Sequence, residues 1–209
     1  MNKDELCEQF KKQPIIASIL KRLHAELPKN LTYHSAQHAE EVLSEVIDLA
    51  LHDSLSDREV QLLAVAAAYH DAGFIIQYFK NEIIGAQMAR EAMQTSGEYS
   101  KEEIEQVVKM ILDTELKPSE TGAFKQFPTT ELSKYLLDAD VGNLGRDDFF
   151  EKGKLLLQEL KEVTLTGFYK NSVALLKAHE WHTKAAKELR EQKKQENLRL
   201  LQDMISEGI

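Results

Sequence analysis

The stretch that decides the fold is Ala64–Phe74, which reads AVAAAYHDAGF. Its first six residues are small or apolar and predict a buried helix. His70 and Asp71 end this apolar run, although a buried histidine needs hydrogen-bond partners and a buried carboxylate needs a cation. Gly73 indicates that the helix is ending, so two adjacent side chains can converge there more easily than in mid-helix. On its own, the dipeptide favours a plainer interpretation, a capping histidine beside a solvated aspartate.

Helical periodicity extends over nearly all of the chain. In HAEEVLSEVIDLALH, which begins at His38, one face at three- and four-residue steps is formed by Val42, Val46, Leu49 and Ala50. Two capping boxes, Ser56 with Glu59 and Ser100 with Glu103, mark the starts of further helices. Residues 114–130 form the longest irregular stretch, and sustained strand alternation is absent from the sequence. We therefore predict an all-α protein with one domain over residues 1–209.

Composition restricts the class of protein. The chain has 209 residues, 43% of them hydrophobic, which fits one globular domain with a sizeable core. Its net charge of −9 differs from the basic character of nucleic-acid binders, so no nucleic-acid partner is expected. The sequence starts without the apolar segment of a signal peptide, and its apolar runs are too short to cross a bilayer. We expect a cytoplasmic protein with no membrane partner.

Two further stretches place polar residues at helix boundaries. YHSAQHAEEV contains His34 and His38, and LLDADVGNLG contains Asp138 and Asp140. The histidine spacing matches the zinc-binding helix of metalloproteases, but Ser35 stands where that motif has glutamate, and it fits a helix N-cap better. Taken alone, these two histidines favour an ordinary structural role.

Taken in order, the three stretches form the pattern H…HD…D and resemble the HD-domain metal-dependent phosphohydrolase superfamily. LGRDDFF and KAHEWHTKAA are similar to a small single-domain bacterial branch of it. The resemblance covers about residues 31–150 and implies an HD-type helical bundle, with C-terminal helices at about 165–206 packed on it. The metal ligands that it implies are His38, His70, Asp71 and Asp140.

The residue chemistry agrees with this implied site. Two imidazoles and two carboxylates suit Mn, Fe, Co, Ni or Mg in an open site better than a closed structural zinc. Such an ion lowers the pKa of water and offsets phosphate charge. The family pattern favours Asp140 over Asp138 as the fourth ligand. Asp138 would then either orient a ligand imidazole or be an exposed carboxylate.

The resemblance also implies catalytic roles. His34 resembles the general acid of cyclic-nucleotide phosphodiesterases, and a substrate-binding or structural role remains equally open. Asp71 is expected at the reaction centre as well as on the metal. Glu82 is a candidate for positioning water or acting as a base, but it also fits a helix-start glutamate favoured by the helix dipole.

The sequence departs from the family at one position. Close relatives have NHE before a helix containing GA, whereas this chain reads YFKNEIIGA and has Asn81 at the histidine position. Because an amide is a poorer ligand than imidazole, we expect about one metal ion per chain. The remaining expectations are His179, His182 and Trp181 as packing or pocket wall, Thr114 as pocket lining, and Arg146 and Lys80 as phosphate contacts or solvated charges.

The expected function is hydrolysis of a phosphomonoester of a nucleotide or another small metabolite. A cyclic-nucleotide or alarmone phosphodiesterase is an alternative, and a di-iron oxygenase is disfavoured by Asn81. A non-catalytic sensor with a decayed second metal site is the alternative from another class. The expected partner is a small phosphate ester. The charged C-terminal tail fits either a homodimer helix or a helix docked on its own domain.

Overall fold

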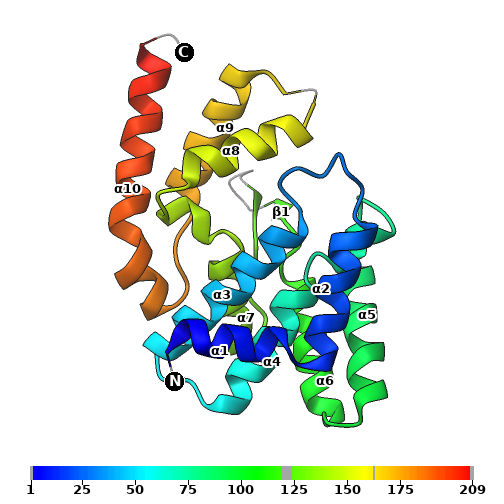
Figure 1. The fold of residues 1–209 in the computed structure, drawn as a ribbon. Coiled ribbons are helices and arrows are strands. Elements are labelled where there is room, and N and C mark those ends of the chain that lie inside the picture. The colour runs from blue at the N-terminus through cyan, green and yellow to red at the C-terminus, as the bar shows by residue number, and fades with distance from the viewer. Residues whose placement is uncertain (1, 119–123, 162, 208–209) are drawn as a thin grey trace.

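The computed structural model describes residues 2–118, 124–161 and 163–207. These residues form α-helices, two short 3-10 helices named η1 and η2, and one small hairpin (Figure 1). In chain order the elements are α1 (Lys3–Lys11), α2 (Pro14–Glu26), α3 (Ala36–His52), α4 (Asp57–Tyr69), η1 (Ala72–Ile75), α5 (Asn81–Ser96), α6 (Lys101–Leu112), β1 (Lys117–Pro118), β2 (Phe124–Lys125), α7 (Glu131–Asp140), η2 (Gly142–Gly145), α8 (Phe149–Glu159), α9 (Leu165–Ala178) and α10 (Lys184–Ser206). The predicted all-α class is confirmed. The antiparallel pair β1–β2 was not predicted and lies in the stretch expected to be irregular, of which residues 119–123 are outside the described residues.

The helices α3 and α4 form the centre of the core. The small residues of α4, from Ala64 to Ala68, are completely buried. Because small side chains let helices approach closely, α4 contacts α2, α3, α5, α6 and α7. The predicted apolar face of α3 is confirmed, since Val42, Val46, Leu49 and Ala50 are all buried.

The helix ends follow the sequence signals. Ser56 with Glu59 and Ser100 with Glu103 form both predicted capping boxes, which begin α4 and α6. The helix α5 ends at Gly97, which adopts the left-handed conformation that glycine allows at little cost.

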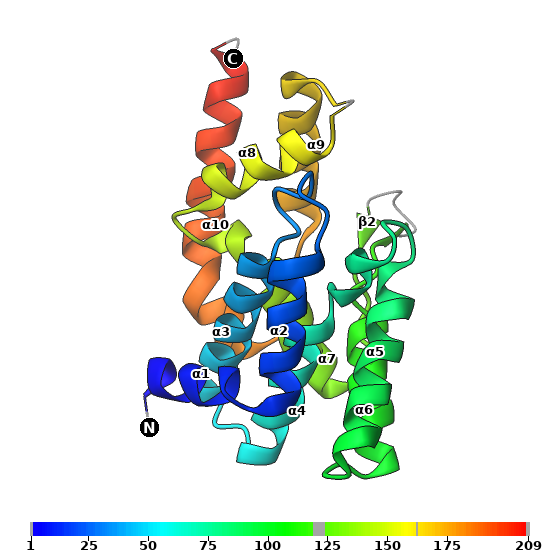
Figure 2. The same ribbon diagram turned by 45° about the vertical axis from the view of Figure 1, so that its right-hand side comes forward.

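The C-terminal helices α8 and α9 lie beyond one end of α3, and α10 runs alongside α3 and past that end (Figures 1 and 2). The charged helix α10 docks on its own domain against η2, α9 and α3. Asn197 donates hydrogen bonds to the carbonyls of Leu144 and Arg146, at 3.0 and 2.9 Å. Gly145 permits this approach, because a Cβ there would lie 2.5 Å from the carbonyl oxygen of Arg190.

A close contact between η1 and α5 positions one side of the site. A Cβ on Gly73 would lie 1.9 Å from the carbonyl oxygen of Asn81, so only glycine allows the start of α5 to pack here. The beginning of α5 is thereby held beside the HD dipeptide. Within residues 2–118, 124–161 and 163–207, none of the helices is both long and apolar enough to cross a membrane.

Candidate metal centre

Three helix ends deliver the four expected ligands to one place. His38 lies in the first turn of α3, where Ser35 is the N-cap and its hydroxyl accepts the backbone N–H of His38. His70 is the C-cap of α4, and Asp71 follows it before η1 begins. Asp140 is the last residue of α7. The relaxed backbone at the end of α4 lets two adjacent side chains face the same point.

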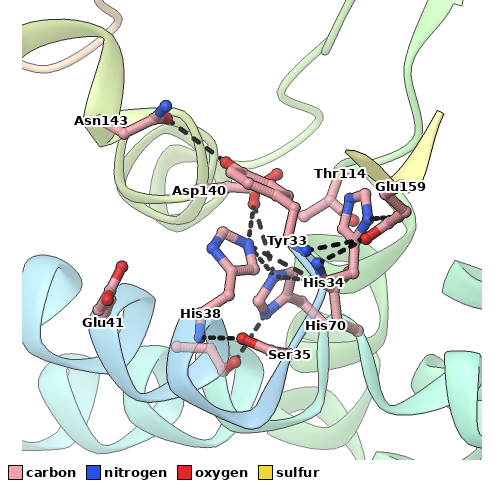
Figure 3. Close-up of polar contacts among 12 residues, drawn as sticks. Tyr33, His34, Ser35, His38, Glu41, His70, Thr114, Asp140, Asn143 and Glu159 are labelled. Atoms are coloured by element: carbon pink, nitrogen blue, oxygen red, sulfur yellow. Dashed lines mark hydrogen bonds and ion pairs between the residues drawn. The ribbon is translucent and has the colours of Figure 1, made fainter. Parts of the chain in front are cut away.

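The polar atoms converge closely (Figure 3). Nε2 of His38 lies 3.2 Å from Oδ1 of Asp140 and 3.4 Å from Nε2 of His70. Nε2 of His70 lies 3.4 Å from the same Asp140 oxygen and 3.3 Å from Oδ2 of Asp71. His38, His70 and Asp71 each offer a ligand atom within 4.8 Å of the others, as a metal ion requires.

The donor set fits a divalent cation. Nδ1 of His70 is 2.7 Å from the carbonyl oxygen of Ala67, to which it donates, so Nε2 faces the cluster and can offer its lone pair to a cation that displaces its proton. Oδ2 of Asp71 is buried, and the described residues provide it with no well-aligned hydrogen bond. A buried carboxylate oxygen without a donor is costly unless a cation lies beside it.

The carboxylates are held in their charged form. Burial alone would raise the pKa of Asp71, but the neighbouring charges, that of His70 foremost, keep it below its ordinary value. Burial likewise opposes ionisation of Asp140, yet hydrogen bonds from His38 and His70 lower its pKa further. Oδ2 of Asp140 accepts a hydrogen bond from Gln126 at 2.6 Å, which leaves Oδ1 directed at the imidazoles.

Next to the ligand cluster, His34 is held by Glu159, a residue that the sequence did not single out. Oε1 of Glu159 lies 2.5 Å from Nδ1 of His34, and Oε2 accepts the backbone N–H groups of Tyr33 and His34 (Figure 3). Burial tends to lower the pKa of His34, but the hydrogen bond to Glu159 and the charge of Asp71 outweigh it, so the pKa is raised. Glu159 ends α8, 125 residues from His34 along the chain.

A cavity of about 390 Å³ opens from the cluster. Its polar end is lined by His34, Asp71, Asp140 and two residues of the first turn of α5, Asn81 and Glu82. Burial raises the pKa of Glu82, with smaller contributions from the charges of Glu115 and Asp71. Oδ1 of Asn81 is buried and accepts no hydrogen bond from the described chain. Thr114 also lines this cavity, as predicted.

Two sequence-based interpretations require correction. Asp138 orients no ligand imidazole, nor is it exposed. Its carboxylate accepts the backbone N–H groups of His182 and Thr183, at 2.9 and 2.8 Å, and so fixes the start of α10. Arg146 is directed at protein carboxylates and does not line the cavity. Its guanidinium binds Asp148 at 2.9 and 3.0 Å and Glu41 at 3.3 Å.

His179 and Trp181 lie apart from the ligand cluster. They line a second cavity, between α9 and α10, that shares no lining residue with the first within the described chain. Their rings pack edge to face, with centroids 4.4 Å apart. The predicted role as packing or pocket wall is therefore confirmed for these two residues, the pocket being this second one.

Comparison with solved structures supports the predicted helical fold. No family model matches the chain, and no curated protein matches it. Among solved structures, it is similar to the crystal structure of a predicted HD superfamily hydrolase from an uncultured Thermotogales bacterium, with a TM-score of 0.63. The two are 18% identical over 99% of each chain. The chain therefore has the HD-type helical fold that its sequence predicted.

Proposed function

We propose that the chain is a metal-dependent hydrolase of phosphate monoesters of small metabolites, with nucleotides among the candidates. The observation that carries this proposal is the buried Oδ2 of Asp71, which faces two imidazoles beside Asp140 at the end of an open cavity. The similarity to a protein described as an HD superfamily hydrolase supports a hydrolase in general. The phosphate ester is the finer part of the proposal.

The ion would be held by His38, His70, Asp71 and Asp140. When bound, a divalent cation supplies Lewis-acid stabilisation of phosphoryl oxygens and a lower pKa for a nearby water. The mixed set of nitrogen and oxygen donors suits Mn, Fe, Co, Ni or Mg. We propose one ion per chain, because Asn81 offers only a neutral amide oxygen on the side of α5.

The surrounding residues have complementary roles in this proposal. His34, kept protonated by Glu159, donates a proton from Nε2 to the leaving alcohol oxygen. The carboxylates of Asp71 and Glu82 orient the attacking water, and Glu82, whose pKa is raised by burial, accepts its proton. The three side chains line the same cavity.

A non-catalytic sensor is the second candidate, because Asn81 replaces the histidine that is expected in this region. Such a protein would bind a metal ion and a ligand without turnover. A phosphodiesterase acting on cyclic nucleotides or alarmones would instead use the same His34 on a diester.

The test combines metal analysis with a substrate panel. The purified protein is stripped with a chelator, reloaded separately with each of the five metals, and assayed on aryl phosphate, nucleoside monophosphates, cyclic nucleotides and alarmones. Metal-dependent release of phosphate from monoesters supports the proposal. Turnover restricted to the diesters or alarmones would identify a phosphodiesterase. Metal binding with no turnover of any substrate would support the sensor.

A further inference from the structure

Beyond its polar end, the cavity is apolar. The side chains that line this part come from α8, α9 and α10 and include Phe150, Leu157, Phe168, Leu175 and Leu201. We call this part the apolar chamber. It belongs to the same continuous cavity as the proposed phosphate position, because that cavity is lined both by Asp71 and by Phe168. An alcohol esterified to a phosphate at the polar end would therefore extend into an apolar environment.

Positive charge is scarce around this cavity. Of its lining residues within 2–118, 124–161 and 163–207, two are lysines and none is an arginine. Lys152 is already engaged, since its ammonium lies 2.6 Å from a carboxylate oxygen of Glu41. A chain of two or three phosphates needs several cationic partners, so the cavity suits a substrate with one phosphate.

The mouth of the cavity is also apolar. Four of its lining side chains are substantially exposed to solvent: Tyr78 by 41%, Leu116 by 54%, Leu160 by 36% and Leu165 by 43%. They come from three separate places: the loop before α5, the loop before β1, and the adjoining ends of α8 and α9. Exposed apolar side chains that meet at a cavity mark a ligand-binding surface more often than isolated ones do.

We infer that the substrate is an amphiphilic phosphate monoester, in which a single phosphate is attached to an apolar chain or ring. The phosphate would lie among His34, Asp71 and Glu82, and the apolar part would fill the chamber and leave through the mouth. That the ligand carries a phosphate rests on the proposed function. That its other part is apolar rests on the lining of the cavity alone.

Binding provides a test that does not need turnover. Methylphosphonate, butylphosphonate and hexylphosphonate are titrated into the manganese-loaded protein by calorimetry. Each added methylene that leaves water should tighten Kd by about three- to fourfold, because burial of a CH₂ contributes about 0.8 kcal/mol. Hexylphosphonate should therefore bind at least about 50-fold more tightly than methylphosphonate. Equal affinities for the three compounds would overturn the inference.

A variant that fills the apolar chamber tests whether the dependence of affinity on chain length arises there. Gly153 lies on α8 and lines the cavity, and a Cβ there would meet the ring of Phe168 at 3.5 Å, an ordinary contact. Gly153→Leu should fold, because leucine is a better helix former than glycine. It should reduce the ratio of hexylphosphonate affinity to methylphosphonate affinity by at least about tenfold. Glu151→Leu is the matched control on the exposed side of α8 and should keep the full ratio.

An assay of ester hydrolysis distinguishes failure of this inference from failure of the proposed function. The loaded protein is assayed on methyl, butyl and hexyl phosphate and on adenosine monophosphate. An increase of kcat/KM with chain length supports the inference. Turnover that is independent of chain length, or fastest with the nucleotide, would overturn the inference and retain the proposed function. Chain-length-dependent binding of the phosphonates without hydrolysis of any ester would overturn the proposed function and retain the apolar ligand.

Discussion

Two regions of this molecule bury carboxylates, and they neutralise them differently. On α3, Glu45 is 4% exposed, and both of its oxygens bind the guanidinium of Arg190, at 2.7 and 3.0 Å. At the candidate metal centre, Asp71 is also largely enclosed, but within the described chain Oδ2 has no hydrogen bond, and its ion-pair contacts are with two imidazole nitrogens, at 3.3 and 3.6 Å. Among the described residues, the first carboxylate has an arginine as a permanent cation, and the second has neither an arginine nor a lysine.

The same contrast extends to neighbouring residues. Glu41, one turn before Glu45, binds Lys152 at 2.6 Å and Arg146 at 3.3 Å. The region on α3 is therefore a closed network whose charges balance within the protein. The region around Asp71 is unbalanced by comparison, and an ion from solution would balance it. A buried carboxylate that is paired within the chain indicates a structural role, and one that is left without a cation indicates a binding site.

The largest expected effect comes from Asp71→Asn, which keeps the size of the side chain and removes its charge. We expect phosphate release to fall at least about 1000-fold, because a metal ligand and a water-orienting carboxylate are lost together. Manganese should raise the melting temperature of the wild type by several degrees, since it binds the native state, and should leave that of the variant unchanged. Metal analysis, kinetics and thermal melts measure these effects. Full metal content in Asp71→Asn would contradict the assignment.

Glu45→Gln is the matching change in the closed network. Among the described residues, it leaves the charge of Arg190 with Asp48, at 3.1 Å, as its remaining ion-pair partner. We expect a loss of about 3 kcal/mol in the free energy of unfolding, because a broken buried pair retains the desolvation cost of the surviving charge. Denaturant titration measures this loss. Metal content and kcat should be unchanged. A variant that keeps its stability but loses metal would reverse the roles of the two regions.

The fold was predictable because helical periodicity and capping boxes act within a few residues. The candidate ligands came from the resemblance across three separated stretches, since each stretch alone favoured an ordinary structural role. Glu159 and Asp138 show what local signals miss. Glu159 looks like an ordinary residue of a charged helix, and its partner His34 is 125 positions away. Asp138 stands two residues before the candidate ligand Asp140, yet its partners are two backbone N–H groups and a hydroxyl 44 and 45 residues later.

A smaller effect is expected from Glu159→Gln, which tests whether Glu159 positions and charges His34. Glutamine retains a hydrogen-bonding group but loses the negative charge that raises the pKa of His34. If protonated His34 is the acid, the pKa of its imidazole falls in the variant. The alkaline limb of the pH–rate profile then moves to lower pH, with a loss of about 10- to 100-fold at pH 8.

Glu151→Gln, on the exposed face of the same helix, is the control for Glu159→Gln and should keep the wild-type pH profile. A loss of rate in Glu159→Gln that is uniform at all pH values, with no shift of the alkaline limb, would show a structural role for Glu159.

The smallest effect concerns an ion pair at the surface, between Arg58 and Glu103. The hydrogen bond from Arg58 is the main cause that lowers the pKa of Glu103 from 4.5 to about 2. A carboxylate with a lowered pKa in the folded state stabilises the protein above its unfolded pKa, and this contribution is lost as the pH falls from about 4.5 towards 2. Because solvent screens the pair, we expect Glu103→Gln to cost less than about 1 kcal/mol at pH 7.

Glutamine retains the capping box with Ser100, so Glu103→Gln isolates the charge of Glu103 from its hydrogen bond to the helix start. Glu102→Gln removes a charge from the same turn and, among the described residues, breaks no ion pair. Urea titrations of the three proteins at pH 7 and pH 3 compare the two changes. The deficit of Glu103→Gln should shrink at pH 3 and with added salt, because protonation and screening each remove what the pair contributes. A deficit as large as that of Glu45→Gln would mean that pairing with arginine stabilises this fold irrespective of burial. The contrast between a closed network and an open site would then lose its physical basis.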